Sequence, residues 1–396
     1  MATPRSLREY IDATTAADLR ARGSVKWTAP GPRGFGAAIA EMDFGTAPPV
    51  LDALSQLVGE AALGYLPPRL AADLADACAS FQRQRYGWAI TPDCVRLVPD
   101  VVRVLELAIT YYSRPDSAVI LPTPAYMPFL KVPPALGRDV IQVPMVTSAD
   151  GRAALDLDGI EDAFRAGGHL LVLCNPHNPL GRVSSRVELT ELTEVVDRHG
   201  GRVFADEIHG PLVYPGSRHV PYAATSGAAA HHTITAASAS KAFNLPGLRC
   251  AQAILTTEAD RRQWDDVVGF AARGASNPGA VANAAAYRHG EPWLAEMLGY
   301  LDESRRLLGS LLAEQIPQIR YRPPEGTYLA WLDCRALDLP ESAAALLAER
   351  AQLTVVDGPE FGRGFDGCIR LNFATPQPVL REMVTRLAAA LTAAAG

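Results

Sequence analysis

The stretch that decides the fold is TITAASASKAFNLPGLRCAQAIL, Thr233–Leu255. Its two ends, TITAAS and CAQAIL, are rich in apolar and β-branched residues and predict two short buried strands. Between them stands one lysine, Lys241, which follows small and hydroxylated residues and precedes Arg249 by eight positions. A single amine and a single guanidinium therefore follow the end of a predicted strand.

Strand and helix patterns alternate around this stretch, over roughly residues 45–255. Helical spacing is clear in PPVLDALSQLVGEAAL, 48–63, and in VVRVLELAITYY, 101–112. Further short buried strands are predicted at 95–98 (VRLV), 117–122 (SAVILP), 169–176 (HLLVLCNP) and 202–207 (RVFADE). This alternation predicts the α/β class, with a mostly parallel sheet that helices cover on both faces.

The pattern changes after residue 255. A long helical pattern at 293–316 precedes predicted strands at 327–333 (TYLAWLD), 353–357 (LTVVD) and 368–373 (CIRLNF) and a closing helix at 379–395. Because a chain of 396 residues exceeds the usual limit for one core, we expect two domains. The prediction is a large domain, residues 46–285, and a smaller α+β C-terminal domain, residues 286–396, to which the N-terminal segment 1–45 belongs.

The composition is that of an ordinary soluble globular enzyme, with 48% hydrophobic and 20% charged residues and a net charge of −6. No run of Lys and Arg indicates a nucleic-acid partner, and the apolar stretches are shorter than the roughly 18 residues of a membrane span. Glu9 and Asp12 stand where a signal peptide would need an apolar core. We therefore expect a cytoplasmic protein that binds neither nucleic acid nor membrane.

The cysteines show neither a CxxC motif nor the Cys/His spacing of a zinc site, so no metal is expected. There are six of them: Cys78, Cys94, Cys174, Cys250, Cys334 and Cys368. Most have apolar neighbours, as in LLVLCNP and LRCAQAIL. We interpret them as small buried hydrophobic residues in a reducing compartment.

Polar residues follow three of the predicted strands directly. They are Asn175, His177 and Asn178 after LLVLC, Asp206, Glu207 and His209 after RVFA, and Ser238, Ser240 and Lys241 after TITAA. Each group alone has a structural explanation, since Asn-Pro forms turns, Asp caps helices and Lys lies on surfaces. Together they fall at the same edge of one sheet, where parallel sheets bind their ligands.

The order Asn-Pro, Asp, Lys and a late Arg resembles the fold type I (aspartate aminotransferase-like) pyridoxal-phosphate enzymes. Further stretches resemble the MalY/PatB-type cystathionine β-lyase branch, a group of carbon–sulfur lyases, and the resemblance covers most of the chain. These stretches are KWTAP, AEMDFGTAP, LGYLPP, PTPAYMPF, CNPHNPLGRV, ADEIHGPLVYPG, SASKAFNLPGL and EGTYLAWLD. His209 in ADEIH favours the lyase branch, because ordinary aminotransferases of this fold usually have tyrosine at that position.

The resemblance implies pyridoxal 5′-phosphate as cofactor. Lys241 would hold its aldehyde and later act as a base, and Asp206 would keep the pyridine nitrogen protonated. Asn178 would bind the 3′ oxygen of the ring, and His209 would support the same edge. Tyr126 would stack on the ring face.

The phosphate of the cofactor needs donors, which several positions offer. The N–H groups of Val101 and Val102 open a predicted helix, and Arg249 supplies a planar cation. The donor set is completed by Ser238, Ser240 and, from the neighbouring subunit of a homodimer with shared active sites, Tyr65. Asp100 departs from the family, which usually has glycine there. Since an acid beside a phosphate is unfavourable, we expect Asp100 to point away.

The expected partner is a small-molecule amino-acid substrate. Arg370 occupies the position of the family's carboxylate-binding arginine, whose planar fork matches a carboxylate. The backbone near Ala40 and Glu41 would close the other side. Trp27 and Phe44 are either pocket residues or core residues, and the sequence does not separate the two.

Three reactions are compatible with these residues. The favoured one is β-elimination from an S-substituted cysteine, such as cystathionine or a cysteine conjugate, to thiol, pyruvate and ammonia. The alternatives are an aminotransferase and a natural-product-pathway enzyme that acts on a cysteine adduct by β-elimination or by decarboxylation coupled to oxidative deamination. A non-enzymatic protein that binds a regulator through its surface is disfavoured, because the whole set of catalytic residue types is present.

Overall fold

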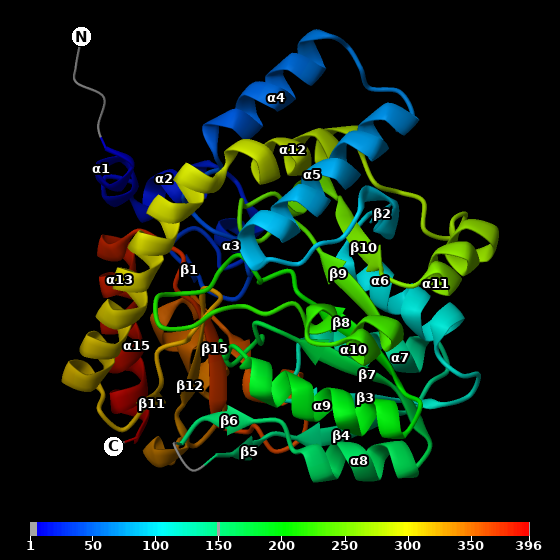
Figure 1. Cartoon of the computed structure of the whole chain (residues 1–396). Coiled ribbons are helices and arrows are strands. Elements are labelled where there is room, and N and C mark those ends of the chain that lie inside the picture. Colours follow the sequence, from blue (N-terminus) through cyan, green and yellow to red (C-terminus); the bar gives the residue numbers. More distant parts are fainter. Residues whose placement is uncertain (1–5, 149–150, 396) are drawn as a thin grey trace. The chain divides into compact units, whose positions relative to one another are not determined.

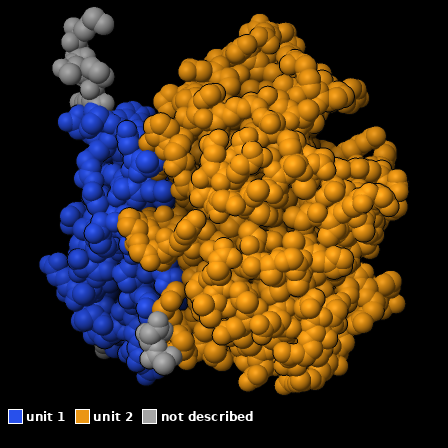
Figure 2. All heavy atoms as spheres, in the orientation of Figure 1, with its two compact units in different colours: residues 1–45, 178–181, 295–396 blue, residues 46–177, 182–294 orange. Residues whose placement is uncertain are grey.

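The computed structural model describes residues 6–148 and 151–395. The chain forms two compact units, shown in different colours in Figure 2. Unit 1 comprises residues 1–45, 178–181 and 295–396, and unit 2 comprises residues 46–177 and 182–294. Four residues from the middle of the chain, Asn178–Gly181, thus belong to the same unit as the two ends.

Unit 2 is built on a seven-stranded sheet, whose strands lie side by side in Figure 1. In spatial order they are β2 (Val95–Val98), β10 (Ala251–Leu255), β9 (Thr233–Ala237), β8 (Arg202–Asp206), β7 (Gly168–Cys174), β3 (Ala118–Thr123) and β4 (Val140–Pro144). Only β10 runs antiparallel to its neighbours β2 and β9. The mostly parallel sheet predicted from the alternation of strands and helices is confirmed.

Neighbouring side chains of each strand enter different cores, since successive side chains of a strand point to opposite faces. Leu170 and Val172 of β7 belong to one buried cluster, and Leu171 and Leu173 belong to the other. The first cluster includes α6 (Val101–Leu107), the π-helical turn Ala108–Tyr112, α7 (Met127–Ala135) and the π-helical turn Trp264–Val268. The second includes α8 (Leu157–Arg165), α9 (Arg186–Arg198) and α10 (Gly227–His232). Helices therefore cover both faces, as predicted.

Among the remaining elements of unit 2, one adds Tyr222 to the second cluster, and the others lie outside both clusters. The remaining elements are α4 (Pro48–Gly59), α5 (Pro68–Tyr86), α11 (Glu258–Gln263), α12 (Asn277–His289), the 3-10 turns Pro92–Cys94, Tyr222–Ala224 and Pro246–Leu248, and the ribbon of β5 (Val146–Thr147) and β6 (Ala153–Ala154). Proline at the start of α4 and α5 suits a position whose N–H needs no helical partner.

Unit 1 combines short N-terminal elements with the C-terminal part of the chain. Its helices are α1 (Leu7–Asp12), α2 (Ala16–Ala21), α3 (Val25–Thr28), α14 (Ala343–Leu346), α15 (Gln377–Ala395) and most of α13 (Glu291–Gln315). A π-helical turn covers Leu347–Ala351, and 3-10 turns cover Arg335–Leu337 and Gly358–Phe361. Four antiparallel strands form its main sheet, in the order β11 (Arg320–Tyr321), β12 (Leu329–Asp333), β15 (Cys368–Asn372) and β14 (Val356–Asp357).

The single strand predicted at 353–357 is wrong. The structure divides it into β13 (Leu353–Thr354), which pairs with β1 (Phe35–Gly36), and β14, which pairs with β15. Because the two halves belong to different sheets, the strand is interrupted between them at Val355. The apolar pattern of LTVVD gives no sign of that division.

Five of the cysteines are buried and Cys174 is half-buried. Burial raises the pKa of the Cys78 and Cys250 thiols to about 12, so both stay protonated at neutral pH. Among the described residues, no helix combines the length and the apolar character that crossing a membrane demands.

Candidate active site

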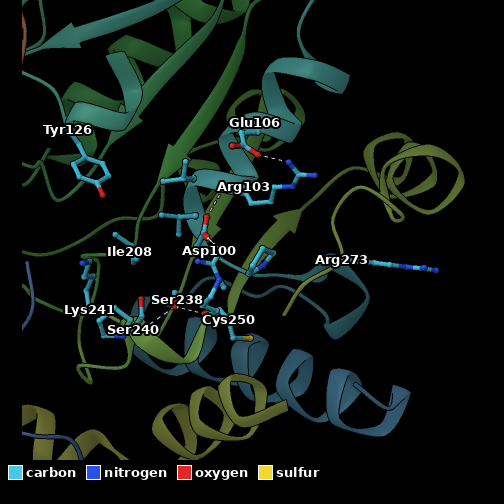
Figure 3. Close-up of a pocket in the computed structure, with 16 residues that line it drawn as sticks. Asp100, Arg103, Glu106, Tyr126, Ile208, Ser238, Ser240, Lys241, Cys250 and Arg273 are labelled. Carbon is cyan, nitrogen blue, oxygen red and sulfur yellow. Dashed lines mark hydrogen bonds and ion pairs between the residues drawn. The ribbon is translucent and has the colours of Figure 1, made fainter. Parts of the chain in front are cut away.

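A cavity of about 560 Å³ opens at the carboxyl end of the parallel strands in unit 2. Figure 3 shows the side chains around it, with that of Arg273 extending away from the others. Its lining consists of Pro99, Asp100, Val101, Val102, Arg103, Glu106, Tyr126, Ile208, Ser238, Ser240, Lys241, Pro246, Arg249, Cys250, Ala251 and Arg273. Seven predicted cofactor-binding residues thus share one cavity: Val101, Val102, Tyr126, Ser238, Ser240, Lys241 and Arg249.

Lys241 stands in a turn that follows β9 and is held by its neighbours. The hydroxyl of Ser238 donates to the carbonyl of Cys250 over 2.8 Å and accepts the N–H of Ser240 over 3.1 Å. The N–H of Ala239 donates to Oδ1 of Asn283 over 2.9 Å. The proton of the Ser238 hydroxyl is therefore committed to the backbone, which makes Ser238 a support of the turn in this structure.

Asp206 ends β8 and is 3% exposed. Its Oδ1 accepts the N–H of Ile208 over 3.0 Å. Burial raises the pKa of this carboxyl to about 7, although the N–H of Ile208 and the charge of Lys241 act in the opposite direction. A cation that lies against such a buried carboxyl stabilises its anionic form.

Asp100 does not point away from the cavity. It is the N-cap of α6, where its Oδ1 accepts the N–H of Arg103 over 2.9 Å. Its Oδ2 accepts from Nη2 of Arg249, also over 2.9 Å. The expectation was wrong because two donors on the cavity wall, a helix N–H and a guanidinium, hold the carboxylate there.

Tyr126 directly precedes α7, and its ring lies edge-on to that of Phe129 with centroids 5.4 Å apart. His209 is 2% exposed and, with Asp206, lies outside the set of residues that line the cavity. Tyr65 is fully exposed and lines a different cavity of unit 2, of about 1010 Å³. Within one chain, Tyr65 is thus separate from the Lys241 cavity.

Arg370 and Asn178 meet in unit 1. Arg370 lies in β15 and is 2% exposed. Its Nη1 donates to Oδ1 of Asn178 over 3.0 Å, and its Nη2 donates to the carbonyl of Ala38 over 2.7 Å. The guanidinium also lies 5.2 Å from the centroid of the Phe361 ring. Two neutral acceptors and an aromatic face orient this buried cation.

The backbone near Ala40 and Glu41, predicted to flank the substrate carboxylate, is held through its carbonyl groups. The hydroxyl of Tyr328 donates to the carbonyl of Ala40 over 2.9 Å, and Nδ2 of Asn372 donates to that of Glu41 over 2.7 Å. Trp27 and Phe44, which the sequence left open, are buried at 1% and 3% exposure. Nε1 of Trp27 donates to Oδ1 of Asp43 over 2.8 Å, and the structure favours a core role for both aromatic residues.

Sequence reasoning missed three charged residues on the cavity wall, Arg103, Glu106 and Arg273. Arg103 forms an ion pair with Glu106 and donates to the carbonyl of Ala271 over 2.5 Å. The spacing of three residues between Arg103 and Glu106 in a predicted helix was an available signal for that pair. Nothing in the local sequence of Arg273 indicated that it belongs to the lining of the cavity.

Comparison with known proteins gives consistent relatives. Residues 36–387 match the family described as aminotransferase class I and II. The chain is 38% identical to the cystathionine beta-lyase of Corynebacterium glutamicum over 94% of this chain and 98% of that protein. It is 31% identical to the cystathionine beta-lyase PatB of Bacillus subtilis over 93% of this chain and 97% of that protein.

A solved structure resembles this chain to a similar degree in sequence and also in fold. The crystal structure of a protein from Corynebacterium diphtheriae, described as a putative PLP-dependent beta-cystathionase, superposes with a TM-score of 0.91. It shares 38% sequence identity and covers 96% of this chain and 98% of its own. The resemblance found in the motifs therefore extends over almost the whole length of both chains. With its fold, its lysine-containing cavity and these relatives, the chain belongs to the class I and II aminotransferase family, in the branch of the MalY/PatB-type cystathionine β-lyases.

Proposed function

We propose that this chain is a pyridoxal 5′-phosphate-dependent carbon–sulfur β-lyase. It cleaves an S-substituted cysteine, with one water, into a thiol, pyruvate and ammonia. The observation that carries the proposal is the single cavity that unites the amine of Lys241, the N-terminus of α6 and the guanidinium of Arg249. The names of the relatives support the same reaction.

The residues present fit this cofactor. Burial raises the pKa of the Asp206 carboxyl to about 7, and a protonated pyridine nitrogen against it would stabilise its anion. The N–H groups of Val101 and Val102, the Ser240 hydroxyl and Arg249 would hold the phosphate. When bound, the cofactor supplies an aldehyde that captures the substrate amine and a ring that withdraws electrons from Cα.

The protein's own groups handle binding and the proton. Arg370 would bind the substrate carboxylate through its planar guanidinium, and the backbone near Ala40 and Glu41 would flank it. Nζ of Lys241 would remove the proton from Cα and would then be able to protonate the departing sulfur. A thiol is a competent leaving group, because its pKa is about 8.5.

Three further side chains would complete the cofactor site. Oδ1 of Asn178 accepts from Arg370, so the amide nitrogen is the part that would donate to the 3′ oxygen of the ring. Tyr126 would stack on the ring. His209, buried three residues after Asp206, would support the same edge of the ring.

The working form is proposed to be a cytoplasmic homodimer with shared active sites. Tyr65 would reach the phosphate held by the partner subunit. The support is the position of Tyr65, whose side chain is fully exposed and lies outside the Lys241 cavity of its own chain. For the domains, we propose a large cofactor-binding domain, 46–285, and a small domain of 286–396 with 1–45.

One experiment tests the reaction. Thiol release from cystathionine or an S-alkylcysteine is measured with and without added pyruvate. A lyase yields thiol, pyruvate and ammonia in equal amounts and needs no keto acid. An aminotransferase stops after one turnover unless a keto acid is present, so strict dependence on pyruvate would overturn the proposal. Thiol release from a large cysteine conjugate alone would place the enzyme in natural-product biosynthesis.

A further inference from the structure

The stretches KW and EMDF contain a buried ion pair that the proposed chemistry does not use. Nζ of Lys26 lies 2.9 Å from Oδ2 of Asp43, and the two side chains are 0% and 4% exposed. The ammonium also donates to the carbonyl of Glu41 over 3.1 Å and to that of Ala374 over 3.3 Å. Its three hydrogens thus have three acceptors, which is its full capacity.

Both carboxylate oxygens of Asp43, and its backbone N–H and carbonyl groups, also form hydrogen bonds. Oδ1 accepts from Trp27 and Oδ2 accepts from Lys26, while its own N–H donates to the carbonyl of Ala374 over 3.1 Å. The carbonyl of Asp43 accepts from Nη1 of Arg22 over 2.9 Å. Lys26 and Asp43 therefore tie the end of the segment Ala37–Asp43 to the chain that follows β15.

The rest of this segment is tied through its carbonyl groups. Nδ2 of Asn372 donates to the carbonyls of Ile39 and Glu41 over 2.6 and 2.7 Å. At its start, the N–H of Asn372 donates to the carbonyl of Ala37 over 2.8 Å. The carbonyl of Ala38 is the acceptor for Nη2 of Arg370. The position of one guanidinium N–H thus depends on where this segment runs.

Close packing leaves the segment little room to move. Gly36 passes so near α3 that a Cβ there would lie 1.7 Å from the carbonyl oxygen of Lys26. The N–H of Ala37 is bound to the carbonyl of Thr354 over 2.9 Å. Lys26 thus contacts the segment at both ends, through its backbone near Gly36 and through its ammonium near Asp43.

A buried ion pair is a poor source of stability, because desolvating two charges offsets most of their attraction, and apolar residues of equal volume serve as well. Unlike apolar residues, the pair forms directional hydrogen bonds, which fix the position of the backbone that they contact. We propose that Lys26 and Asp43 are positioning residues of the substrate-carboxylate site: they hold the segment Ala37–Asp43 so that the carbonyl of Ala38 orients Arg370. This inference rests on the proposed function, which makes Arg370 the carboxylate ligand.

The test uses the double variant Lys26→Met/Asp43→Asn. It removes both charges together, so that no charge is left buried alone, and the asparagine keeps an acceptor for Trp27. The holoenzyme is titrated with L-alanine and with L-alaninamide, which differ in the carboxylate, and binding is followed by the absorbance of the cofactor. We expect the affinity for alanine relative to alaninamide to fall about tenfold, the effect of a weakened charged hydrogen bond. Affinity for the cofactor itself should stay unchanged.

Two control variants separate an effect on the carboxylate site from a general loss of stability. Leu387→Ala removes a buried side chain of α15 and lowers stability without touching the segment, so its ratio should equal that of the wild type. Arg370→Lys should lower the ratio at least as far as the double variant. Suppose that the affinity for alanine relative to alaninamide is lowered in Arg370→Lys but stays at the wild-type value in the double variant. This result would overturn the inference about Lys26 and Asp43 and would leave the proposed function intact. A wild-type ratio in Arg370→Lys would remove Arg370 from the carboxylate site, and the inference would fall with that part of the proposed function.

Discussion

The carboxylate of Asp100 and the guanidinium of Arg249 lie 2.9 Å apart on the wall of the Lys241 cavity. The anion at position 100 is thus paired with a cation on the same cavity wall. Both side chains are well exposed, at 41% and 64%, and such pairs contribute little stability. Their importance is therefore expected in the affinity for the cofactor phosphate, because Asp100 would compete with that phosphate for Arg249.

Asp100→Asn should bind pyridoxal 5′-phosphate more tightly, by up to roughly fivefold, the upper value for one exposed ion pair. Asparagine caps a helix as well as aspartate, so the melting temperature should hardly change. Equilibrium titration of the apoprotein with cofactor measures the effect. Arg249→Met should weaken binding, and in the double variant the gain from Asp100→Asn should vanish. Weaker binding by Asp100→Asn alone would contradict the competition.

Lys241→Ala should lose the visible absorbance of the lysine-bound cofactor and should lower turnover by several orders of magnitude. The reason is that, in the proposed function, this one amine is both the anchor of the cofactor and the base. Spectra and thiol release measured on the same preparation give the two readouts. Near-native turnover on an S-substituted cysteine would exclude Lys241 from the mechanism.

Mixing two inactive variants, Tyr65→Ala and Lys241→Ala, should restore activity if each site takes its tyrosine from the partner. Every mixed dimer would then hold one intact site and one doubly altered site. Random mixing should recover about a quarter of the wild-type activity. Each variant alone is the control, and light scattering verifies the dimer. A mixture no more active than its components would place Tyr65 outside the partner's site.

Asp206 should make the cofactor-free protein less stable as the pH rises from about 4 to about 7. The folded carboxyl has a pKa of about 7, whereas that of an unfolded aspartate is about 3.9. Between these values only the folded state holds the proton, so the free energy of unfolding falls with increasing pH and then levels off. Urea titrations of apoprotein across this range measure the slope. Asp206→Asn should abolish this contribution, and an unchanged pH profile in that variant would refute the assignment.

Local pattern predicted most of the framework. The strands predicted between residues 95 and 255 correspond to β2, β3, β7, β8, β9 and β10. They could be recognised because the apolar residues of strands and helices repeat with different periods, and a few residues are enough to tell the two apart. The polar residues at the strand ends followed from the same reasoning, since parallel strands finish at one edge of a sheet. Seven of the predicted cofactor-binding residues do line one cavity.

What the sequence determined by itself is the order of elements and the chemical types at their ends: an amine after β9, the carboxyl of Asp206 at the end of β8 and an arginine in β15. The tertiary structure alone decided which distant groups meet. Arg370 binds Asn178 across 192 residues, and Arg249 binds Asp100 across 149. The division of 353–357 between two sheets and the burial of Lys26 against Asp43 are likewise non-local. A charged residue has the same local pattern on a surface as in a buried pair, and only the packing of separate segments supplies its partner.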